Sequence, residues 1–220
     1  TAWGSRSVFA VSGMDGSIIW HYDTDEYGDG GWIYEVDAEH DFNDDGIRDI
    51  LAASGDDGSN FGPRRVQLFN GVNGDKLWEQ AFYVAMTAVI SLDDINGDSV
   101  PDVVCASSPD YTDGYIYVLD GNTGNIINQI NSNSMAVWGL CPINDINNDG
   151  LMDYAYGDFN GAIKIVTSPA DVTTSFSTQN GLITHMESIT AYNQKSYILS
   201  GTLNDYFPLI NATDGIISWA

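Results

Sequence analysis

Positive charge is the scarcest property of this sequence. Seven Lys and Arg residues stand against 31 Asp and Glu residues among 220, which gives a formal net charge of −24. This balance argues against a nucleic-acid partner, because almost nothing is present to neutralise phosphate groups. Metal cations are the natural counterions for so many carboxylates.

Long apolar runs are missing as well. No window approaches the ~18 uninterrupted apolar residues of a membrane-spanning helix, so we expect no membrane span. The first residues, TAWGSRSVFAVSG, lack the basic segment and the long apolar core of a signal peptide. This start is typical of a mature or trimmed product.

Cysteine is nearly absent. The two cysteines, Cys105 and Cys141, lie in apolar segments that resemble strands. Buried free thiols are the favoured interpretation, and a disulfide remains open because sequence spacing does not supply the required Cβ geometry. Asn211-Ala-Thr matches a glycosylation sequon, but such triplets occur often by chance.

The residues that are abundant indicate β-structure. Hydrophobic residues make up 43% of the chain and aromatic residues 12%, which is enough for a packed core. Helical patterns rich in Ala, Glu, Lys and Leu are lacking, whereas Gly, Asn, Asp, Ser and Thr separate short runs of Val, Ile, Tyr and Phe. The composition therefore predicts an all-β protein.

A hairpin pattern recurs along the chain. Each copy has an alternating strand, a G-x-x-G turn and a second short strand that usually ends in Trp, and glycine permits the positive φ of a tight turn. The copies lie at residues 7–20, 65–78, 115–128 and 207–219, with a weaker one at 162–176. The turn glycines are Gly13, Gly16, Gly71, Gly74, Gly121, Gly124 and Gly215. Spacings of about 44 to 58 residues are typical of propeller blades.

Apolar strands between the hairpins complete a unit of four antiparallel strands, which is one blade of a β-propeller. We therefore predict a single β-propeller domain with about four blades and an N-terminal half-blade hairpin. Four blades can close a small ring, and the hairpin is then surplus, with open strand edges that are normally covered or paired. The domain spans residues 1–220, the hairpin 7–22, and the blades 32–81, 84–131, 135–177 and 182–220.

Three acidic loops, DFNDDGIRD at 41–49, DINGDSVPD at 94–102 and DINNDGLMD at 145–153, separate strands of successive units. Each has side-chain oxygens at positions 1, 3, 5 and 9 and a carbonyl available at position 7. Ca²⁺ prefers six to eight oxygen ligands in a flexible shell, so we predict about three Ca²⁺ sites. The expected ligands are Asp41, Asn43, Asp45, Ile47 and Asp49; Asp94, Asn96, Asp98, Val100 and Asp102; and Asp145, Asn147, Asp149, Leu151 and Asp153.

Other interpretations of these loops are weaker. An EF-hand needs a bidentate Glu at position 12 and flanking helices, but that position holds Ala52, Cys105 or Tyr156 and strands flank the loops. Mg²⁺ gives up water reluctantly, and Zn²⁺ prefers Cys or His ligands. A merely solvated turn is plausible for one copy. Three copies in one register favour a cation site.

Two positions depart from the loop pattern. Position 6 is glycine in two loops but Ser99 in the second, where we expect a strained turn or a weaker site. The corresponding segment of the fourth blade, residues 188–201, has no acidic ladder and carries Lys195. We favour a turn that needs no ion there, and the alternative is that the ammonium group partly replaces one.

The D-x-N-x-D-G-x-x-D loops resemble the calcium-binding FG-GAP or VCBS-type repeats of integrin α-subunit propellers and of many bacterial extracellular proteins. The G-x-x-G-x-x-x-W hairpins are similar to the tryptophan-docking repeats of quinoprotein-like (PQQ-like) propellers. This resemblance implies a β-propeller, an extracellular or cell-surface location, structural Ca²⁺, and a role in adhesion or recognition. No residues for a quinone cofactor can be placed.

Residues for catalysis are not evident. The histidines His21, His40 and His185 are dispersed without ligand spacing, so we expect ordinary surface or strand residues. No Ser-His-Asp order is present, and among so many acids no pair can be singled out for glycoside chemistry. We therefore expect a protein that is not an enzyme.

Tryptophans and long connections remain to be placed. Trp20, Trp78 and Trp219 share one repeat position, which favours packing between blades over sugar stacking, whereas Trp3, Trp32 and Trp138 lie outside that frame and are left unassigned. The connections at residues 23–31, 55–65 and 108–115 are candidates for recognition or are solvated insertions.

Two hypotheses for function follow. The first is a calcium-stabilised extracellular propeller with a structural or adhesive role, which assembles head-to-tail into filaments when its surplus hairpin adds to a neighbouring copy. An extracellular protein or a glycan is a further possible partner. The second is a fragment of a larger seven- or eight-bladed propeller from a carbohydrate-active enzyme or cell-surface receptor.

Overall fold

A computed structural model describes residues 6–24, 31–56, 62–108, 113–134, 136–167, 171–177, 181–190, 195–203 and 207–219. These residues form eighteen strands and no α-helix, which confirms the all-β prediction. Within these ranges no helix has the length and hydrophobicity that crossing a membrane requires.

Four four-stranded antiparallel sheets, here called blades, follow one another along the chain, and in each blade the order of strands in space is their order in sequence. Blade 1 contains β3 (Trp32–Asp37), β4 (Ile50–Gly55), β5 (Arg65–Phe69) and β6 (Lys76–Ala81). Blade 2 contains β7 (Met86–Leu92), β8 (Asp102–Ser107), β9 (Tyr115–Leu119) and β10 (Ile126–Asn131). Blade 3 contains β11 (Val137–Ile143), β12 (Asp153–Asp158), β13 (Ala162–Thr167) and β14 (Asp171–Ser177). Blade 4 contains β15 (Ile183–Thr190), β16 (Ser196–Thr202), β17 (Leu209–Asn211) and β18 (Ile217–Trp219).

The N-terminal hairpin forms a two-stranded sheet of its own, from β1 (Ser7–Val11) and β2 (Ile18–Asp23). It packs against blade 1 through a cluster in which Val8 and Trp20 meet Phe69. The hairpin therefore occupies the place of a preceding blade, and its two strands correspond to the last two strands of a blade.

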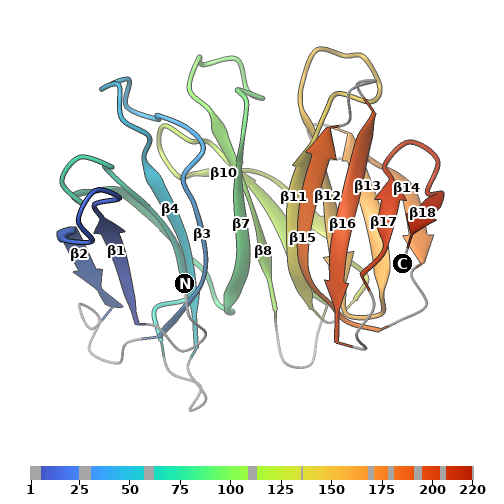
Figure 1. Cartoon of the computed structure of the whole chain (residues 1–220), viewed down its shortest axis with the longest axis horizontal. Helices are drawn as coiled ribbons and strands as arrows, with labels where there is room; N and C mark the ends of the chain where they lie inside the picture. Colours follow the sequence, from blue (N-terminus) through green and yellow to red (C-terminus); the bar gives the residue numbers. More distant parts are fainter. Residues whose placement is uncertain are drawn as a thin grey trace.

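The blades form an open arc. The first strands β3, β7, β11 and β15 are neighbours from one blade to the next and form the inner edge of the arc. Figure 1 shows β1 and β2 at one end of the molecule and β17 and β18 at the opposite end. The described blades thus differ from the small closed ring that four blades can make, because the hairpin at one end and the outer strands of blade 4 at the other lie apart.

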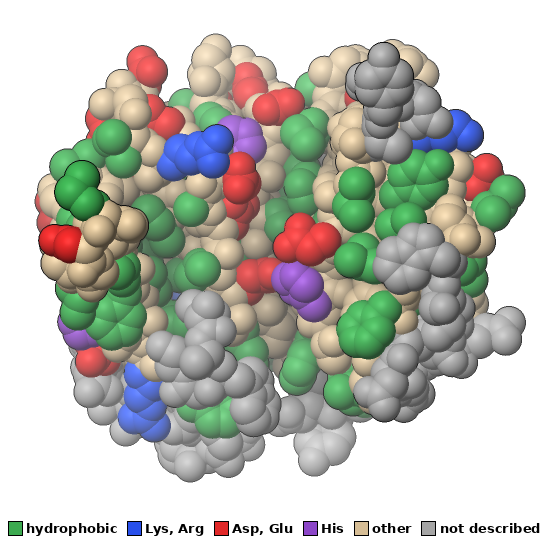
Figure 2. All heavy atoms as spheres, viewed as in Figure 1, with side chains coloured by type: hydrophobic (Ala, Val, Ile, Leu, Met, Phe, Trp, Pro, Cys, Tyr) green, Lys and Arg blue, Asp and Glu red, His purple; other side chains and the backbone are tan. Residues whose placement is uncertain are grey.

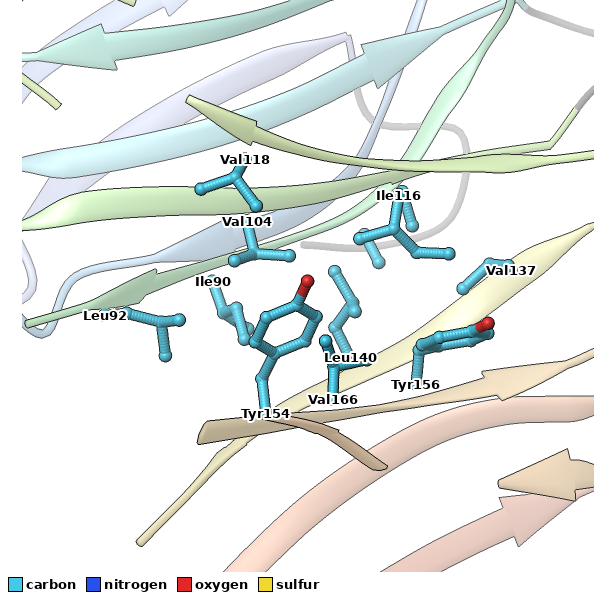
Figure 3. Packing of buried hydrophobic residues seen from close by; sticks show 12 residues of the cluster. Ile90, Leu92, Val104, Ile116, Val118, Val137, Leu140, Tyr154, Tyr156 and Val166 are labelled. Atoms are coloured by element: carbon cyan, nitrogen blue, oxygen red, sulfur yellow. The ribbon is translucent and has the colours of Figure 1, made fainter. Parts of the chain in front are cut away.

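Hydrophobic clusters fill the spaces between neighbouring blades. Between blades 2 and 3, Val104 and Ile116 from one sheet face Tyr154 and Tyr156 from the other (Figure 3). Side chains alternate along each strand, so Val104 packs toward blade 3 while Cys105 packs toward blade 1. Middle strands are therefore buried on both faces, and their sequences read as continuous apolar runs.

Both cysteines are buried free thiols, as the favoured interpretation expected. Cys105 belongs to the cluster between blades 1 and 2, whereas Cys141 belongs to the cluster between blades 3 and 4. Burial raises the pKa of both thiols far above the usual range. At the sequon, Asn211 is only 6% exposed and its side chain accepts a hydrogen bond from the N–H of Thr213, so it is a poor acceptor for a glycan.

Tryptophan side chains connect successive blades. The indole N–H of Trp20 donates to the carbonyl oxygen of Gly71 at 3.0 Å, and that of Trp78 donates to Gly121 at 2.7 Å. Both rings lie over the G-x-x-G turn of the following blade. This confirms that these two tryptophans pack between blades, whereas the side chain of Trp219 and all of Trp3 lie outside the described residues.

Candidate metal loops and the groove at the inner edge

Each acidic loop connects the first strand of a blade to its second strand. The three loops follow β3, β7 and β11, and because the blades share one topology they lie on the same face of the arc, at the top of Figure 1. The connection between β15 and β16 in blade 4 has no such sequence, and residues 191–194 lie outside the described part of the chain.

Backbone hydrogen bonds orient the acidic side chains of the first loop. Asp41 accepts from the N–H of Gly46 at 2.8 Å, Asn43 accepts from Asp45 at 3.0 Å, and Asp45 accepts from Ile47 at 2.9 Å. The side chains at positions 1, 3 and 5 therefore point toward the inside of one tight bend. They accept hydrogen bonds from the backbone of that same bend, as Asp and Asn often do in turns.

The other two loops repeat this arrangement. Their hydrogen bonds join the same pairs of positions, and their donor–acceptor distances lie close to those of the first loop. They run from Ser99 to Asp94 at 2.7 Å, Asp98 to Asn96 at 2.9 Å, Val100 to Asp98 at 2.9 Å, Gly150 to Asp145 at 2.8 Å, Asp149 to Asn147 at 3.1 Å and Leu151 to Asp149 at 2.9 Å.

Positive φ angles occur at positions 4 and 6 of every loop. Position 4 has φ of 57° at Asp44, 88° at Gly97 and 61° at Asn148, and position 6 has 88° at Gly46, 74° at Ser99 and 91° at Gly150. The second loop thus exchanges the two residue types, with glycine at position 4. Ser99 adopts the left-handed conformation that strains a non-glycine residue, as expected.

The position-9 carboxylates are buried, and those of the first two loops tie the loop to the hairpin of its own blade. Asp49 accepts from the N–H of Phe42 and from the N–H of Gly71, both at 2.9 Å. Asp102 accepts from Ile95 at 2.8 Å and from Gly121 at 3.0 Å. Asp49, Asp102 and Asp153 are at most 1% exposed.

Gly71 and Gly121 therefore serve two contacts at once. The N–H of Gly71 donates to Asp49 in its own blade, and its carbonyl oxygen accepts from Trp20 of the preceding hairpin. Gly121 is held in the same way by Asp102 and Trp78. A side chain has no room at Gly71, because a Cβ there would lie 2.0 Å from the carbonyl oxygen of Arg48.

Repulsion between carboxylates is evident in the first loop. Burial raises the pKa of the Asp49 carboxyl, hydrogen bonds from backbone N–H groups oppose the shift, and the charges of Asp41 and Asp45 add to it. Positions 1, 5 and 9 are therefore close enough to interact. A cation among them would remove this repulsion.

The donor set fits a hard cation. Every side chain at positions 1, 3, 5 and 9 offers oxygen, and Ca²⁺ accepts such ligands together with water and backbone carbonyls. The Asn43 amide donates to Asp49 and the Asn70 amide donates to Asp45, so N–H groups now face these carboxylates. Among the described residues, no group of three or more His, Cys, Asp or Glu side chains has the geometry of a formed metal site.

A groove runs along the inner edge of the arc. Its cavity of about 640 Å³ is lined by residues of β3, β7, β11 and β15, and acidic and histidine side chains gather there in the centre of the view in Figure 2. His40 and His185 are far apart in the sequence and show no ligand spacing, yet both line this groove.

Glu35 is the most perturbed carboxyl of the groove. It accepts a 3.0 Å hydrogen bond from the N–H of Val89 on β7, and its other oxygen lies 3.9 Å from Nδ1 of His185. Burial raises the pKa of Glu35 to about 8, and the charges of Asp37 and Glu187 add to the shift. A carboxyl group is thus kept protonated near neutral pH at the inner edge.

Four β-bulges shape one end of this groove. The register of each inner strand shifts at the same place, so that Tyr34, Thr87, Trp138 and Thr184 are the extra residues. All four line a second cavity of about 230 Å³ that shares Glu35 and His185 with the groove. Bulges redirect side chains, which explains how residues outside the alternating pattern converge here.

Comparison with known proteins identifies the architecture. No known family profile and no curated protein matches the sequence. Among solved structures, Saccharomyces cerevisiae Sqt1 is similar with a TM-score of 0.69 and 14% identity over 97% of this chain and 55% of Sqt1. The Dos1 propeller is similar with a TM-score of 0.64 and 13% identity over 96% of this chain and 51% of that one.

The fold is a β-propeller. A third similar structure, BBS1N solved in complex with ARL6DN, has a TM-score of 0.62 and 12% identity over 85% of this chain and 53% of its own. The chain thus spans about half the length of each of these three proteins. At such low identity the similarity defines the propeller architecture alone.

Proposed function

We propose that this propeller is stabilised by Ca²⁺ in its three acidic loops and has a structural or adhesive role outside the cell, without catalysis. The observation that supports this most is the common geometry of the loops, in which the side chains at positions 1, 3 and 5 turn into one bend and the position-9 carboxylate is buried. The carboxylates repel one another without a cation, and binding would close each bend.

The ligands of each ion would be the oxygens of positions 1, 3, 5 and 9 and the carbonyl of position 7, with water completing the shell. Because the position-9 carboxylates of the first two loops, Asp49 and Asp102, also hold a turn glycine, closing these loops would strengthen the contact that each glycine makes with the preceding hairpin or blade. The metal would therefore act on the joints between blades rather than on a reaction.

Self-assembly is the form of the structural role that we propose. The open arc supports it, because β1 and β2 lack the two inner strands of a complete blade within the described residues and lie far from blade 4. A neighbouring copy that covers this end would leave its own hairpin open, so the contact would propagate head-to-tail into a filament.

The groove is the surface that we propose for an adhesive contact with an extracellular protein or a glycan. In the second cavity at the end of the groove, the aromatic side chains of Tyr34 and Trp138 lie with ring centroids 6.4 Å apart beside Glu35 and His185. Aromatic faces beside polar groups suit sugar rings and protein side chains alike.

A second candidate is that these blades belong to a larger ring of a carbohydrate-active enzyme or cell-surface receptor. The open arc and the match to about half of each similar propeller favour it. Sizing and electron microscopy separate the two candidates, because filaments are expected for the first and monomers with exposed ends for the second. Turnover on a polysaccharide panel would support an enzyme.

Metal analysis and melting test the calcium proposal. Protein purified without chelator should contain about three Ca²⁺ per chain, and EGTA should lower its melting temperature, with recovery on adding Ca²⁺ but not on adding Mg²⁺ to the same concentration. Native protein free of calcium, or a melting curve that EGTA leaves unchanged, would refute it.

A further inference from the structure

The turn of the N-terminal hairpin has the shape of the docking turns in later blades. The N–H of Gly16 donates to Ser12 at 2.9 Å, as Gly74 donates to Asn70 at 2.8 Å. The φ angle is 74° at Gly16 and 78° at Gly74. The hairpin therefore presents the same backbone surface as a turn that receives a tryptophan.

The later turns each hold an aromatic ring. A Cβ added at Gly74 would lie 2.7 Å from Trp20, one at Gly124 would lie 2.6 Å from Trp78, and one at Gly215 would lie 2.1 Å from Phe176. Around Gly16, by contrast, a Cβ would meet no atom within 4 Å in the part of the chain that the structure describes. The turn at Gly16 therefore has the shape that receives an aromatic ring, but none of the described residues places a ring there.

The opposite end of the arc offers a matching strand. Trp219 stands four residues after Gly215, which is the spacing of Trp20 from Gly16 and of Trp78 from Gly74. In β18, Trp219 pairs with Leu209, in the register in which Trp78 pairs with Leu68. In β2 and β6 this register directs an indole onto the next blade.

Apolar surface is exposed at both ends. Phe9 and Val11 are 49% and 54% exposed on the side of β1 that faces away from blade 1. On blade 4, Phe207 and Ile217 are 55% and 43% exposed. Figure 2 shows hydrophobic side chains at both ends of the arc. Contact between the two ends would remove this surface from water.

We propose that the Gly13–Gly16 turn is a docking site for Trp219 of a second copy of this chain, with the indole N–H donating to the carbonyl oxygen of Gly13. The interface continues the blade-to-blade contact seen at Gly71 and Gly121. Because the turn and Trp219 lie at opposite ends of the open arc, the contact joins different copies head-to-tail. It rests on the self-assembly proposed above and names the residues that carry it.

Substitution of Gly16 tests the acceptor. Gly16→Asn keeps a residue that tolerates positive φ but adds a Cβ where the ring must lie. Asp15→Asn introduces the same residue one position earlier and adds no such atom, so it is the matched control. In sedimentation velocity at about 1 to 200 μM, the wild type and Asp15→Asn should form concentration-dependent oligomers, whereas Gly16→Asn should lose them.

Substitution of Trp219 tests the donor. Trp219→Ala should abolish assembly. Trp219→Phe should retain much of it, because Phe176 already occupies the turn at Gly215. A far-ultraviolet circular dichroism spectrum and a calcium-dependent melting temperature equal to those of the wild type show that each variant is folded.

A mixture of the two variants gives the sharpest result. Gly16→Asn retains its donor and Trp219→Ala retains its acceptor, so an equimolar mixture should form a heterodimer and stop there. A wild type that stays monomeric would overturn the docking site, as would oligomers that both variants form normally. In the latter case self-assembly itself would stand, and calcium stabilisation is measured separately by melting with EGTA.

Discussion

The indole N–H of Trp78 donates to the carbonyl oxygen of Gly121 in the next blade, across a distance of 2.7 Å. The same ring lies over Gly124, where a Cβ would approach it to 2.6 Å. One side chain thus combines a directed hydrogen bond with a packed ring, and the hydrogen bond explains why the repeat uses tryptophan rather than any large apolar residue.

Truncation of Trp78 should separate these two contributions. We expect Trp78→Phe to lower the free energy of unfolding by about 1 kcal/mol through the lost hydrogen bond, and Trp78→Ala to lower it by about 3–5 kcal/mol through the lost packing as well. Urea denaturation measures both. Ile127→Ala, at an outer-strand residue that is 41% exposed, is the control and should change little. Equal effects of Phe and Ala would contradict the role of ring packing.

We expect the second acidic loop to have the most strained backbone of the three. Ser99 has a φ of 74°, so Ser99→Gly should relieve strain and stabilise the protein by about 1 kcal/mol. Ser99→Ala keeps a Cβ in the same conformation and should bring no such gain. Differential scanning calorimetry compares the variants. A melting temperature that Ser99→Gly leaves unchanged or lowers would show that the loop is not strained at this residue.

Calcium stoichiometry should fall loop by loop. Asp145→Asn removes the position-1 carboxylate of the third loop, and we expect the bound calcium to decrease from about three ions per chain to about two. Asp44→Asn removes a carboxylate at position 4, which is not an expected ligand, and should leave the stoichiometry unchanged. Isothermal titration calorimetry of the chelated protein counts the sites. The same stoichiometry in both variants would rule out Asp145 as a ligand.

Glu35 should make the stability depend on pH. Its pKa is raised to about 8, so between pH 4.5 and 8 the folded state holds a proton that the unfolded state releases. This contribution is full below about pH 4.5 and is lost as the pH rises through 8, with a slope of up to about 1.4 kcal/mol per pH unit.

Glu35→Gln should remove this dependence, because the amide can still accept from Val89 and does not titrate. In urea denaturation, the free energy of unfolding of the variant minus that of the wild type should increase from about pH 5 to pH 8. Asp37 on β3 and His185 and Glu187 on β15 face Glu35 and remain in both proteins. Glu39→Gln, at a side chain that is 70% exposed, is the control. Parallel pH curves for Glu35→Gln and the wild type would contradict the prediction.

The repeat frame could be predicted from the sequence because it depends on local chemistry. Glycines with positive φ, an alternating strand on each side and a tryptophan four residues after the turn define each hairpin without reference to distant residues. The acidic loops were recognisable for the same reason, since their hydrogen bonds join residues two to five positions apart, as between Asp41 and Gly46.

Long-range features could not be predicted in this way. The link from Asp49 to Gly71 spans more than twenty residues, and glycine at position 71 gives no indication of its partner. The groove depends on a bulge in each inner strand, which breaks the alternation by one residue and brings Tyr34 and Trp138 together. A hydrophobic pattern does not mark where such a shift falls, so His185 and Glu35 were not expected to meet.

The position of Gly71 and Gly121 also determines how the arc carries load. A force that pulls two blades apart would act on an indole ring, pass through the backbone of one glycine and reach a buried carboxylate at the end of an acidic loop. Tension between neighbouring blades is thus transmitted into the loops instead of ending at the apolar contact. In a filament of such arcs, the resistance to extension would depend on whether these acidic loops are closed.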